Sequence, residues 1–385
     1  MKDRAGIYMN NTDGYTSFLP KKLPPDPPLT VDAETQEFLS LADRKLGRLD
    51  GIAEILPNPD LFVAMYVKKE ALLSSQIEGT QASLIDVLDV DSIDKQDIKK
   101  SHVDEVVNYV AAMNYGLDRL ASLPLSLRLI REIHAILLSG VRGAEKSPGE
   151  FRRTQNWIGP QGCTLANATF VPPTVSEMNR AMGDLELFMH DEEHRIPPLI
   201  KIAYIHAQFE TIHPFLDGNG RVGRLLITFW LCHQRILNQP LLYLSYYFKQ
   251  NRTEYYDRLM DIRKKGAWEN WVNFFLKGIS EVSDEAIDSA KQILRLKNKY
   301  TEVLLRAESA NSSIALYNTL FTSPVITRTQ VAEYLKVTSP TAGSMVENFC
   351  SLGILKDITP DRIRNKKYSF AEYLAIIEKG TENYV

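Results

Sequence analysis

The residue types best suited to chemistry are concentrated in twelve consecutive positions, the segment HPFLDGNGRVGR from His213 to Arg224. Two glycines around Asn219 let backbone N–H groups converge, and the apolar run from Leu225 to Leu231 predicts a helix that starts there. A glycine-rich turn at the positive end of a helix is typical of an anion-binding site. We therefore expect this segment to hold phosphate.

The charged members of this segment indicate what each could do with a phosphate ester. Arg221 and Arg224 are three residues apart, so both would project from the first turn of the helix toward phosphate oxygens. Asp217 is the only acid in the segment, and a single carboxylate completed by water and phosphate oxygens is how proteins usually hold Mg²⁺. His213 then serves as the proton acceptor, because an imidazole with a pKa of about 6.5 can act at neutral pH.

Two common nucleotide-binding motifs fit the same residues less well. Residues 218–223 satisfy the pattern GxGxxG, but the segment before them has helical rather than strand spacing, and no acid lies about 20 residues after Gly223. No Lys-Ser or Lys-Thr pair follows the glycines, which excludes a Walker phosphate loop. A histidine beside proline or an Asp-Gly-Asn-Gly turn is usually structural when it stands alone. It is their combination in one segment that predicts a reaction site.

This segment is similar to the signature of the Fic family, HxFx(D/E)GNGRxxR, with every defining position filled. The resemblance implies an α-helical fold and, for most members, transfer of AMP from ATP to a hydroxyl group of a target protein. On that resemblance, His213 would take the proton from the target Ser, Thr or Tyr, and Asp217 would hold Mg²⁺. The nucleotide-binding positions that it implies in this segment are Asp217, Gly218, Asn219, Gly220, Arg221, Val222, Gly223 and Arg224.

Two further stretches extend the resemblance. A short hairpin called the flap precedes the motif in Fic proteins, and Asn167-Ala168-Thr169-Phe170 resembles it. A later helix usually brings aromatic side chains to the adenine, and Tyr255 and Tyr256 lie in a segment similar to that element. The family asparagine that can contact the base is replaced by Arg263, so phosphate binding is expected more firmly than a preference for adenine.

A second motif predicts an inhibitory contact. The segment SSQIEG from Ser74 to Gly79 fits the Fic inhibitory pattern (S/T)xxxE(G/N), at the end of a helical stretch. Glu78 placed against Arg224 would form a charge-assisted pair and occupy the arginine meant for the γ-phosphate. The structural alternative is a solvated Glu78 that ends a helix, with Gly79 as the residue after the cap.

The elements around these motifs are predicted to be mainly helical. Helical spacing of apolar residues covers 35–79, 101–140, 174–190, 199–212, 224–237, 255–271 and 281–306. Five prolines in residues 20–28 predict an extended arm, and the segment 146–173, rich in Gly and Pro, predicts a loop with a small hairpin. The fold class is therefore mainly α, a helical Fic core with a β-hairpin flap.

The C-terminal segment has a different pattern. Thr327-Arg328-Thr329-Gln330 has the form of a capping box, and Ser339-Pro340 supplies a helix cap and a first-turn proline. Two short helices followed by ILKDIT and KKYSF resemble a winged helix-turn-helix. We expect an N-terminal arm and helical region with the inhibitory helix at 1–105, the catalytic domain at 106–280, a linker helix at 281–308 and this winged-helix-like domain at 309–385.

The charge balance bears on binding partners. The chain of 385 residues carries 45 basic and 48 acidic side chains, so no overall field favours nucleic acid or membrane. Residues 311–385 carry eight Lys or Arg against seven Asp or Glu, and we favour protein contact over DNA binding for this region. Three distant cysteines and the absence of a long apolar run lead us to expect a cytoplasmic protein that does not span a membrane.

Several alternatives stay open on the sequence. Some Fic proteins transfer other phosphate-containing groups such as UMP or phosphocholine, and some use the inhibitory glutamate to remove AMP. A DNA-binding regulator in which the Fic part is a sensor is a further alternative. The target protein is not encoded in any motif, and the resemblance allows a homodimer, because Fic proteins often self-associate.

Overall fold

The computed structural model describes residues 3–12, 14–55, 59–89, 98–160, 162–306 and 310–382, and this part of the chain is mainly helical, as expected. Its helices are α1 (Ala33–Ile55), α2 (Pro59–Ile77), α3 (Leu84–Leu88), α4 (Ile98–Leu120), α5 (Leu127–Leu137), α6 (Val175–Met189), α7 (Pro198–Ile212), α8 (Asn219–His233), α9 (Ser245–Gln250), α10 (Arg252–Lys265), α11 (Trp268–Leu304), α12 (Ala310–Thr319), α13 (Arg328–Leu335), α14 (Ser339–Ser351) and α15 (Ala371–Glu378). The strands are β1 (Gly6–Asn10), β2 (Thr16–Pro20), β3 (Val325–Thr327), β4 (Lys356–Asp357) and β5 (Lys367–Ser369). None of the described helices combines the length and the apolar character needed to cross a bilayer.

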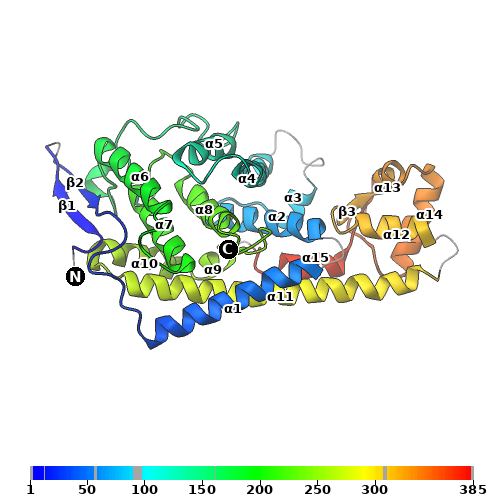
Figure 1. Ribbon diagram of the computed structural model, residues 1–385. Coiled ribbons are helices and arrows are strands. Elements are labelled where there is room, and N and C mark those ends of the chain that lie inside the picture. Colours follow the sequence, from blue (N-terminus) through cyan, green and yellow to red (C-terminus); the bar gives the residue numbers. More distant parts are fainter. Residues whose placement is uncertain are drawn as a thin grey trace.

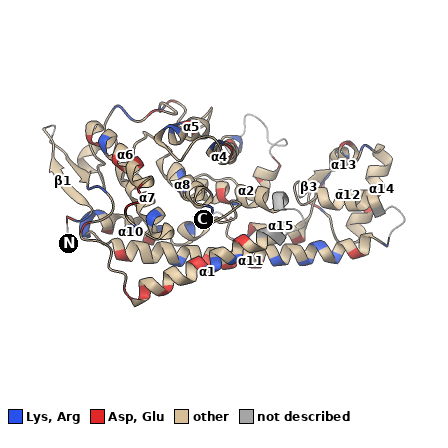
Figure 2. Cartoon of the chain, viewed as in Figure 1, with Lys and Arg blue, Asp and Glu red and all other residues tan. Residues whose placement is uncertain are grey.

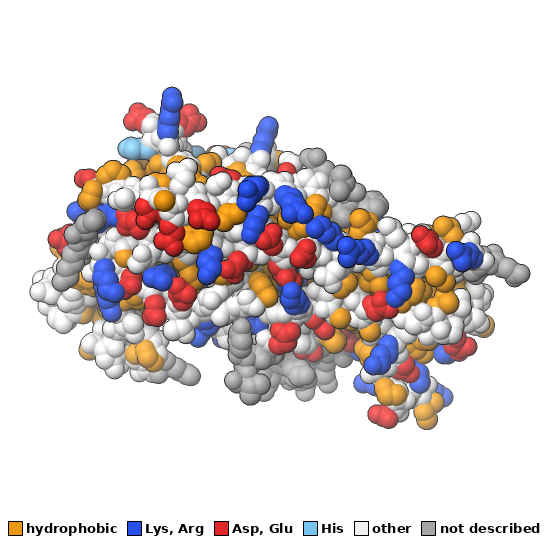
Figure 3. Space-filling model, turned by 90° about the horizontal axis from the view of Figure 1, so that it is seen from below, with side chains coloured by type: hydrophobic (Ala, Val, Ile, Leu, Met, Phe, Trp, Pro, Cys, Tyr) orange, Lys and Arg blue, Asp and Glu red, His pale blue; other side chains and the backbone are white. Residues whose placement is uncertain are grey.

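Two long helices form one side of the molecule. Helix α1 packs along α11, and α11 extends beyond it to the C-terminal elements (Figure 1). Both helices bury an apolar stripe and expose charged residues of both signs (Figure 2). Seen from below, Lys and Arg side chains are interspersed with Asp and Glu on this face (Figure 3). The surface seen there therefore has no single sign of charge.

One helix predicted from the sequence is divided between α10 and α11. Residues 255–271 are not a single helix, because α10 ends at Lys265 and Gly266 adopts a left-handed conformation with φ of 67°. Glycine tolerates this conformation without the steric cost of a Cβ atom, so it ends the helix. Helix α11 then runs without a break through position 281. The boundaries predicted at 105/106 and 280/281 fall within the continuous helices α4 and α11, and that at 308/309 lies outside the described residues. As domain limits they stay predictions.

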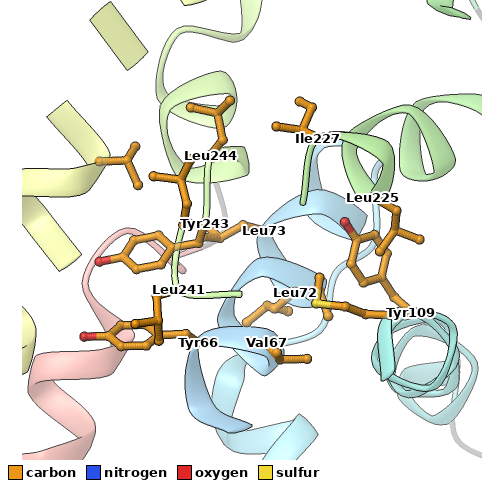
Figure 4. Packing of buried hydrophobic residues seen from close by; sticks show 14 of the residues in the cluster. Tyr66, Val67, Leu72, Leu73, Tyr109, Leu225, Ile227, Leu241, Tyr243 and Leu244 are labelled. Carbon is orange, nitrogen blue, oxygen red and sulfur yellow. The ribbon is translucent and has the colours of Figure 1, made fainter. Parts of the chain in front are cut away.

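The hydrophobic core next to the motif loop is built around α7 and α8. Every residue of α7 from Leu199 to Ile212 is buried, and Pro198 starts the helix at a position where its missing N–H costs nothing. Figure 4 shows side chains of α2 packed on two sides: Leu72 lies toward Tyr109 of α4, and Tyr66 stacks with Tyr243, which follows α8. Full burial of an aliphatic side chain such as that of Leu72 contributes about 1.5–3 kcal/mol to the stability of the fold. Packing on all sides therefore fixes the two helices that flank the motif loop.

An antiparallel hairpin of β1 and β2 precedes the proline-rich arm, and the sequence pattern did not predict it. Phe18 of β2 is fully buried, and its ring centroid lies 5.9 Å from that of Phe170. The Phe18 N–H donates to the carbonyl oxygen of Val171 at 2.9 Å. The hairpin thus packs directly against the segment predicted as the flap.

The flap itself is smaller than predicted. Ile158 and Phe170 form one isolated antiparallel bridge, and a 3-10 turn at Leu165–Asn167 takes the place of a regular hairpin. The reason lies in Pro160, Pro172 and Pro173, which have no N–H to extend a ladder of hydrogen bonds. The flap is therefore a loop with a single paired position.

The C-terminal elements include a three-stranded antiparallel sheet in the order β3-β5-β4, with α13 packed against β3 and α14 packed against α13. The predicted capping box is present, because Gln330 N–H donates to Thr327 Oγ1 and Thr327 N–H donates to Gln330 Oε1. The predicted cap of α14 was wrong by one residue: Thr338, not Ser339, accepts from the N–H of Thr341. The element order fits a winged helix-turn-helix, which stays an interpretation.

Candidate active site

The motif loop between α7 and α8 is held by side chains from distant parts of the chain. His134 of α5 donates from Nε2 to the carbonyl oxygen of Asp217 at 3.0 Å and stacks on Phe215 with a centroid distance of 3.7 Å. Arg152 Nε and Asn156 Nδ2 each donate to the carbonyl oxygen of His213 at 3.1 Å. These anchors leave the His213 ring as the part of the residue that faces the pocket.

His213 directly follows α7 in a left-handed conformation with φ of 51°. The positive φ turns the chain sharply, and His213 is 19% exposed on its side chain. Burial lowers its pKa to about 3, and the charge of the neighbouring Arg263 acts in the same direction. The imidazole is therefore neutral at physiological pH and has a lone pair available.

Helix α8 begins at Asn219, so Arg221 lies in its first turn, as predicted, although the apolar run starts only at Leu225. Gly218 caps it in a left-handed conformation with φ of 77°, and the Asn219 side chain bonds both the N–H and the carbonyl oxygen of Phe215 at 2.8 Å. Asn219 thus closes the loop with its side chain. The loop presents the first backbone N–H groups of a helix of 15 residues, where the helix dipole favours an anion.

The two motif arginines have different surroundings. Arg221 is 1% exposed, with Nη1 at 3.7 Å from Glu105 and Nη2 at 3.4 Å from Asp217. Arg224, also 1% exposed, donates from Nε to Ser74 Oγ at 2.7 Å and from Nη2 to Glu78 Oε1 at 2.7 Å. Arg224 is therefore already engaged by the segment predicted to inhibit.

Glu78 lies one residue beyond the end of α2, next to Gly79 with φ of 95°. Burial alone would raise its pKa, but the charge and hydrogen bond of Arg224 outweigh burial, and the pKa lies below its usual value. A Cβ atom at Gly220 would come within 2.3 Å of Glu78 Oε1, so only glycine there leaves room for the carboxylate. Sequence positions 146 residues apart thus meet in one ion pair.

A pocket of about 490 Å³ joins these groups, and this volume suits a small-molecule ligand. Among the predicted site residues it is lined by Glu78, Thr169, Phe170, His213, Gly220, Arg224, Tyr255 and Tyr256. It is also lined by Arg263, which the sequence analysis placed at the base-contact position of the family, and by residues that it did not single out, namely Trp157, Ile158, Gly159, Glu210, Arg252, Leu259 and Met260. Three arginines and two carboxylates therefore surround one cavity.

Other predicted residues do not line this pocket. Asn167 is exposed and caps Thr164, Ala168 is half-buried beside it, and the side chain of Val222 is fully buried in the core.

The two tyrosines that line the pocket differ in exposure. Tyr255 is almost wholly buried, and its hydroxyl donates to Nε2 of His206 at 2.9 Å. Tyr256 is 37% exposed and carries the Arg252 guanidinium 5.3 Å above its ring, so it presents more of its surface to a ligand.

Asp217 is the residue whose chemistry fits a divalent cation. Its side chain is 35% exposed, and Oδ1 accepts from the N–H of Gly218 and from Arg221. Within the described residues its other oxygen, Oδ2, accepts no hydrogen bond, and no group of three or more His, Cys, Asp or Glu residues could hold a metal ion. One carboxylate, with phosphate and water completing the shell, matches the way Mg²⁺ is bound.

Two family models and several curated proteins match this chain. The model "Fic/DOC family N-terminal" matches residues 36–118, and the model "Fic/DOC family" matches residues 124–231. The chain is 30% identical over 186 residues to protein adenylyltransferase Fic of Drosophila grimshawi and 29% identical over 187 residues to that of Culex quinquefasciatus. These alignments cover 48% of this chain and 34% and 33% of the relatives. The chain thus spans about a third of the length of these relatives.

Solved structures share the fold. A Fic family protein from Desulfovibrio desulfuricans G20 superposes with a TM-score of 0.59 at 20% identity, covering 89% of this chain and 97% of that one. A Fic domain containing signaling protein from Bacteroides thetaiotaomicron gives a TM-score of 0.50 at 18% identity, covering 67% and 97%. The motif lies at the start of α8, and the two family models match consecutive parts of the chain. The chain therefore belongs to the Fic/DOC family.

Proposed function

We propose that this protein transfers AMP from ATP to a hydroxyl side chain of a target protein, and that Glu78 restrains the reaction. The observation that supports this most is a single pocket in which a neutral His213, the glycine turn at Gly220 and the buried Arg224 meet. The name of the curated relatives, protein adenylyltransferase, points to the same reaction.

His213 would act on the incoming hydroxyl group. Its neutral ring takes the proton of the target Ser, Thr or Tyr as the hydroxyl oxygen attacks the α-phosphorus. A new oxygen–phosphorus bond forms, the bond to the β,γ-pyrophosphate breaks, and pyrophosphate leaves with its electron pair. A pKa of about 3 makes His213 a weak base among these protein groups alone, but the negative charges of bound phosphates would raise its pKa toward 7.

The remaining groups would hold the nucleotide. The N-terminus of α8 and the guanidinium of Arg224 offer donors to phosphate oxygens, and Asp217 would hold Mg²⁺, which neutralises charge that develops on the phosphates. The base would lie toward Tyr256 and the apolar residues Leu259 and Met260, which line the same pocket. Positioning and electrostatics thus account for the catalysis, with no covalent enzyme intermediate.

The restraint would be competition for one arginine. Arg224 donates to Ser74 through Nε and to Glu78 and the Ser74 carbonyl oxygen through Nη2. A γ-phosphate would have to displace the carboxylate before it could use these donors, and two anions in a shielded site repel each other. Nucleotide would therefore enter in an unproductive position until Glu78 moves away.

Mass spectrometry tests the donor and the reaction together. Purified Glu78→Gly protein is incubated with cell lysate, ATP and Mg²⁺, and modified peptides are identified by the added mass. We expect AMP on Ser, Thr or Tyr, with little modification when Glu78→Gly is combined with His213→Ala. An added UMP or phosphocholine group would show that the protein transfers that group and not AMP. Loss of AMP from modified peptides would show that it catalyses the removal reaction.

A further inference from the structure

Glu210 is a carboxylate in the pocket that neither motif contains. It lies in the last turn of α7, three residues before His213, with its side chain 9% exposed. Its Oε2 atom is 3.9 Å from Nδ1 of His213. Its Oε1 atom lies against α8, where a Cβ atom at Gly223 would approach it to 2.3 Å. Gly223 therefore provides the space that lets this carboxylate point at the active-site histidine.

Two neighbouring polar atoms here are buried without a hydrogen bond in the described part of the chain, namely Oε1 of Glu210 and Nδ1 of His213. An unsatisfied buried group costs about 1–3 kcal/mol, so such a pair calls for an explanation. A separation of 3.9 Å between Oε2 and Nδ1 exceeds a hydrogen bond by about 1 Å. A small side-chain rotation would join the carboxyl group to the imidazole.

The charged surroundings of Glu210 come from several elements. Arg224 of α8, Arg263 of α10 and Glu78 act on it electrostatically, and Tyr255 lies close enough for its own pKa to respond to Glu210. His213 is in turn influenced by Arg263, by the Glu210 carbonyl group, by Arg152 and by Glu78. Burial raises the pKa of Glu210 to about 7. The carboxyl group can therefore change its charge near neutral pH.

We propose that Glu210 is a positioning residue for His213, which rests on the function proposed above. Its carboxylate accepts the Nδ1–H of His213, so the ring keeps its Nε2 lone pair toward the hydroxyl group of the target. When the hydroxyl proton moves to Nε2, the ring becomes positively charged, and Glu210 supplies the adjacent negative charge. The proton on Nδ1 stays where it is, and no further reactant is required.

The kinetic test compares Glu78→Gly with Glu78→Gly/Glu210→Gln. We expect kcat to fall about 10- to 100-fold, as for a lost charge-assisted hydrogen bond, while the KM for ATP stays nearly constant. In the Glu78→Gly protein, kcat/KM should rise with pH through an inflection near or below 7, because removing Glu78 removes one cause of the raised Glu210 pKa. Glutamine cannot ionise, so the double variant should lose this inflection.

Glu70 provides a matched control. It is a second buried carboxyl group whose pKa is raised to about 7 by burial, but it bonds Ser245 and Tyr109 away from His213. Glu70→Gln in the same background should keep the inflection and the kcat. If Glu210→Gln behaves like Glu70→Gln in kcat and in the pH profile, the positioning role is overturned.

A measurement without turnover separates this proposal from the proposed function. Nitrogen-15 NMR of the imidazole groups of the wild-type protein reports which ring nitrogen of His213 carries the proton, and the His213→Ala spectrum assigns its signals among seven histidines. We expect the Nδ1–H form at pH 8 and a change in the balance of the two forms as Glu210 takes a proton near pH 7. A proton on Nε2 at pH 8, or a balance that does not respond to pH, would overturn the role of Glu210 even if no AMP transfer were ever found.

Discussion

Replacing Glu78 by glutamine isolates the charge of the contact with Arg224. The glutamine keeps the size of the side chain and one oxygen acceptor, while Arg224 retains its bonds to Ser74 at 2.7 and 2.9 Å. A hydrogen bond between charged groups contributes about 1.5–3 kcal/mol, which corresponds to about 10- to 150-fold in an equilibrium. We therefore expect the initial rate of AMP transfer to rise by about 10- to 150-fold, with Glu78→Gly at the upper end.

The assay follows transfer of label from α-³²P-ATP to protein at an ATP concentration below the wild-type KM. Glu132→Gln is the matched control, because Glu132 is also a partly exposed glutamate bonded to arginine, at 25% against 31% exposure, and lies outside the pocket. Its rate should equal that of the wild type. Thermal unfolding of each variant checks that the fold is intact.

One result would refute the reasoning directly. If Glu78→Gln and Glu78→Gly are folded, bind ATP and still transfer AMP no faster than the wild type, then the ion pair with Arg224 does not limit the reaction. A rise of the same size in Glu132→Gln would show instead that the assay responds to a general loss of negative charge.

Three further predictions concern other parts of the chain. His213→Ala in the Glu78→Gly background should lower transfer about 10²–10⁴-fold while calorimetry still detects ATP binding, since a positioned base contributes that much; unchanged turnover would remove His213 from the reaction. His206 is fully buried with a pKa lowered to about 3 by burial, so the unfolded chain gains a proton on it below about pH 6.5 and the folded chain does not. Between pH 7 and pH 5 the wild type should therefore lose about 2 kcal/mol more of its free energy of unfolding than His206→Gln, measured by urea titration; equal losses would contradict this. Lys366 and Lys367 of the predicted wing pair with Asp357 and Asp89, so we expect no retardation of duplex DNA at low salt, and a salt-sensitive shift lost in Arg364→Ala would reverse that expectation.

The part of the site that the sequence predicts well is contiguous. The motif from His213 to Arg224 carries its own turn, helix start and charges within twelve residues, so the spacing alone indicates a loop that ends at a helix N-terminus. Glu78 was expected against Arg224, and the structure has the two side chains 2.7 Å apart. Only a family pattern allowed that pairing, because nothing local in residues 74–79 points to a partner so far along the chain.

The rest of the site depends on packing that no local pattern encodes. From the sequence, Glu210 is expected to be an exposed polar residue of a helix. The structure shows that it is buried, because every face of α7 is buried. Arg152 and His134 hold the motif loop from segments whose periodicity predicts only a loop and an amphipathic helix. The hairpin β1–β2 could have been suspected from Gly14, which lies between two short runs rich in β-formers and has a positive φ of 81°.

The last described residues return to the segment that the sequence predicts to be inhibitory, residues 74–79. Helix α11 has 37 residues and so carries the chain about 56 Å outward before the C-terminal elements bring it back. There the amide group of Gln76, two residues before Glu78, donates to the carbonyl oxygen of Thr381 at 2.8 Å, and Lys249 donates to Gln76 and to the carbonyl oxygen of Glu382. Helix α11 and the segment after α15 thus both connect the C-terminal elements to the rest of the described chain. The contact between Glu78 and Arg224 therefore lies only two residues from a side chain that binds the C-terminal segment.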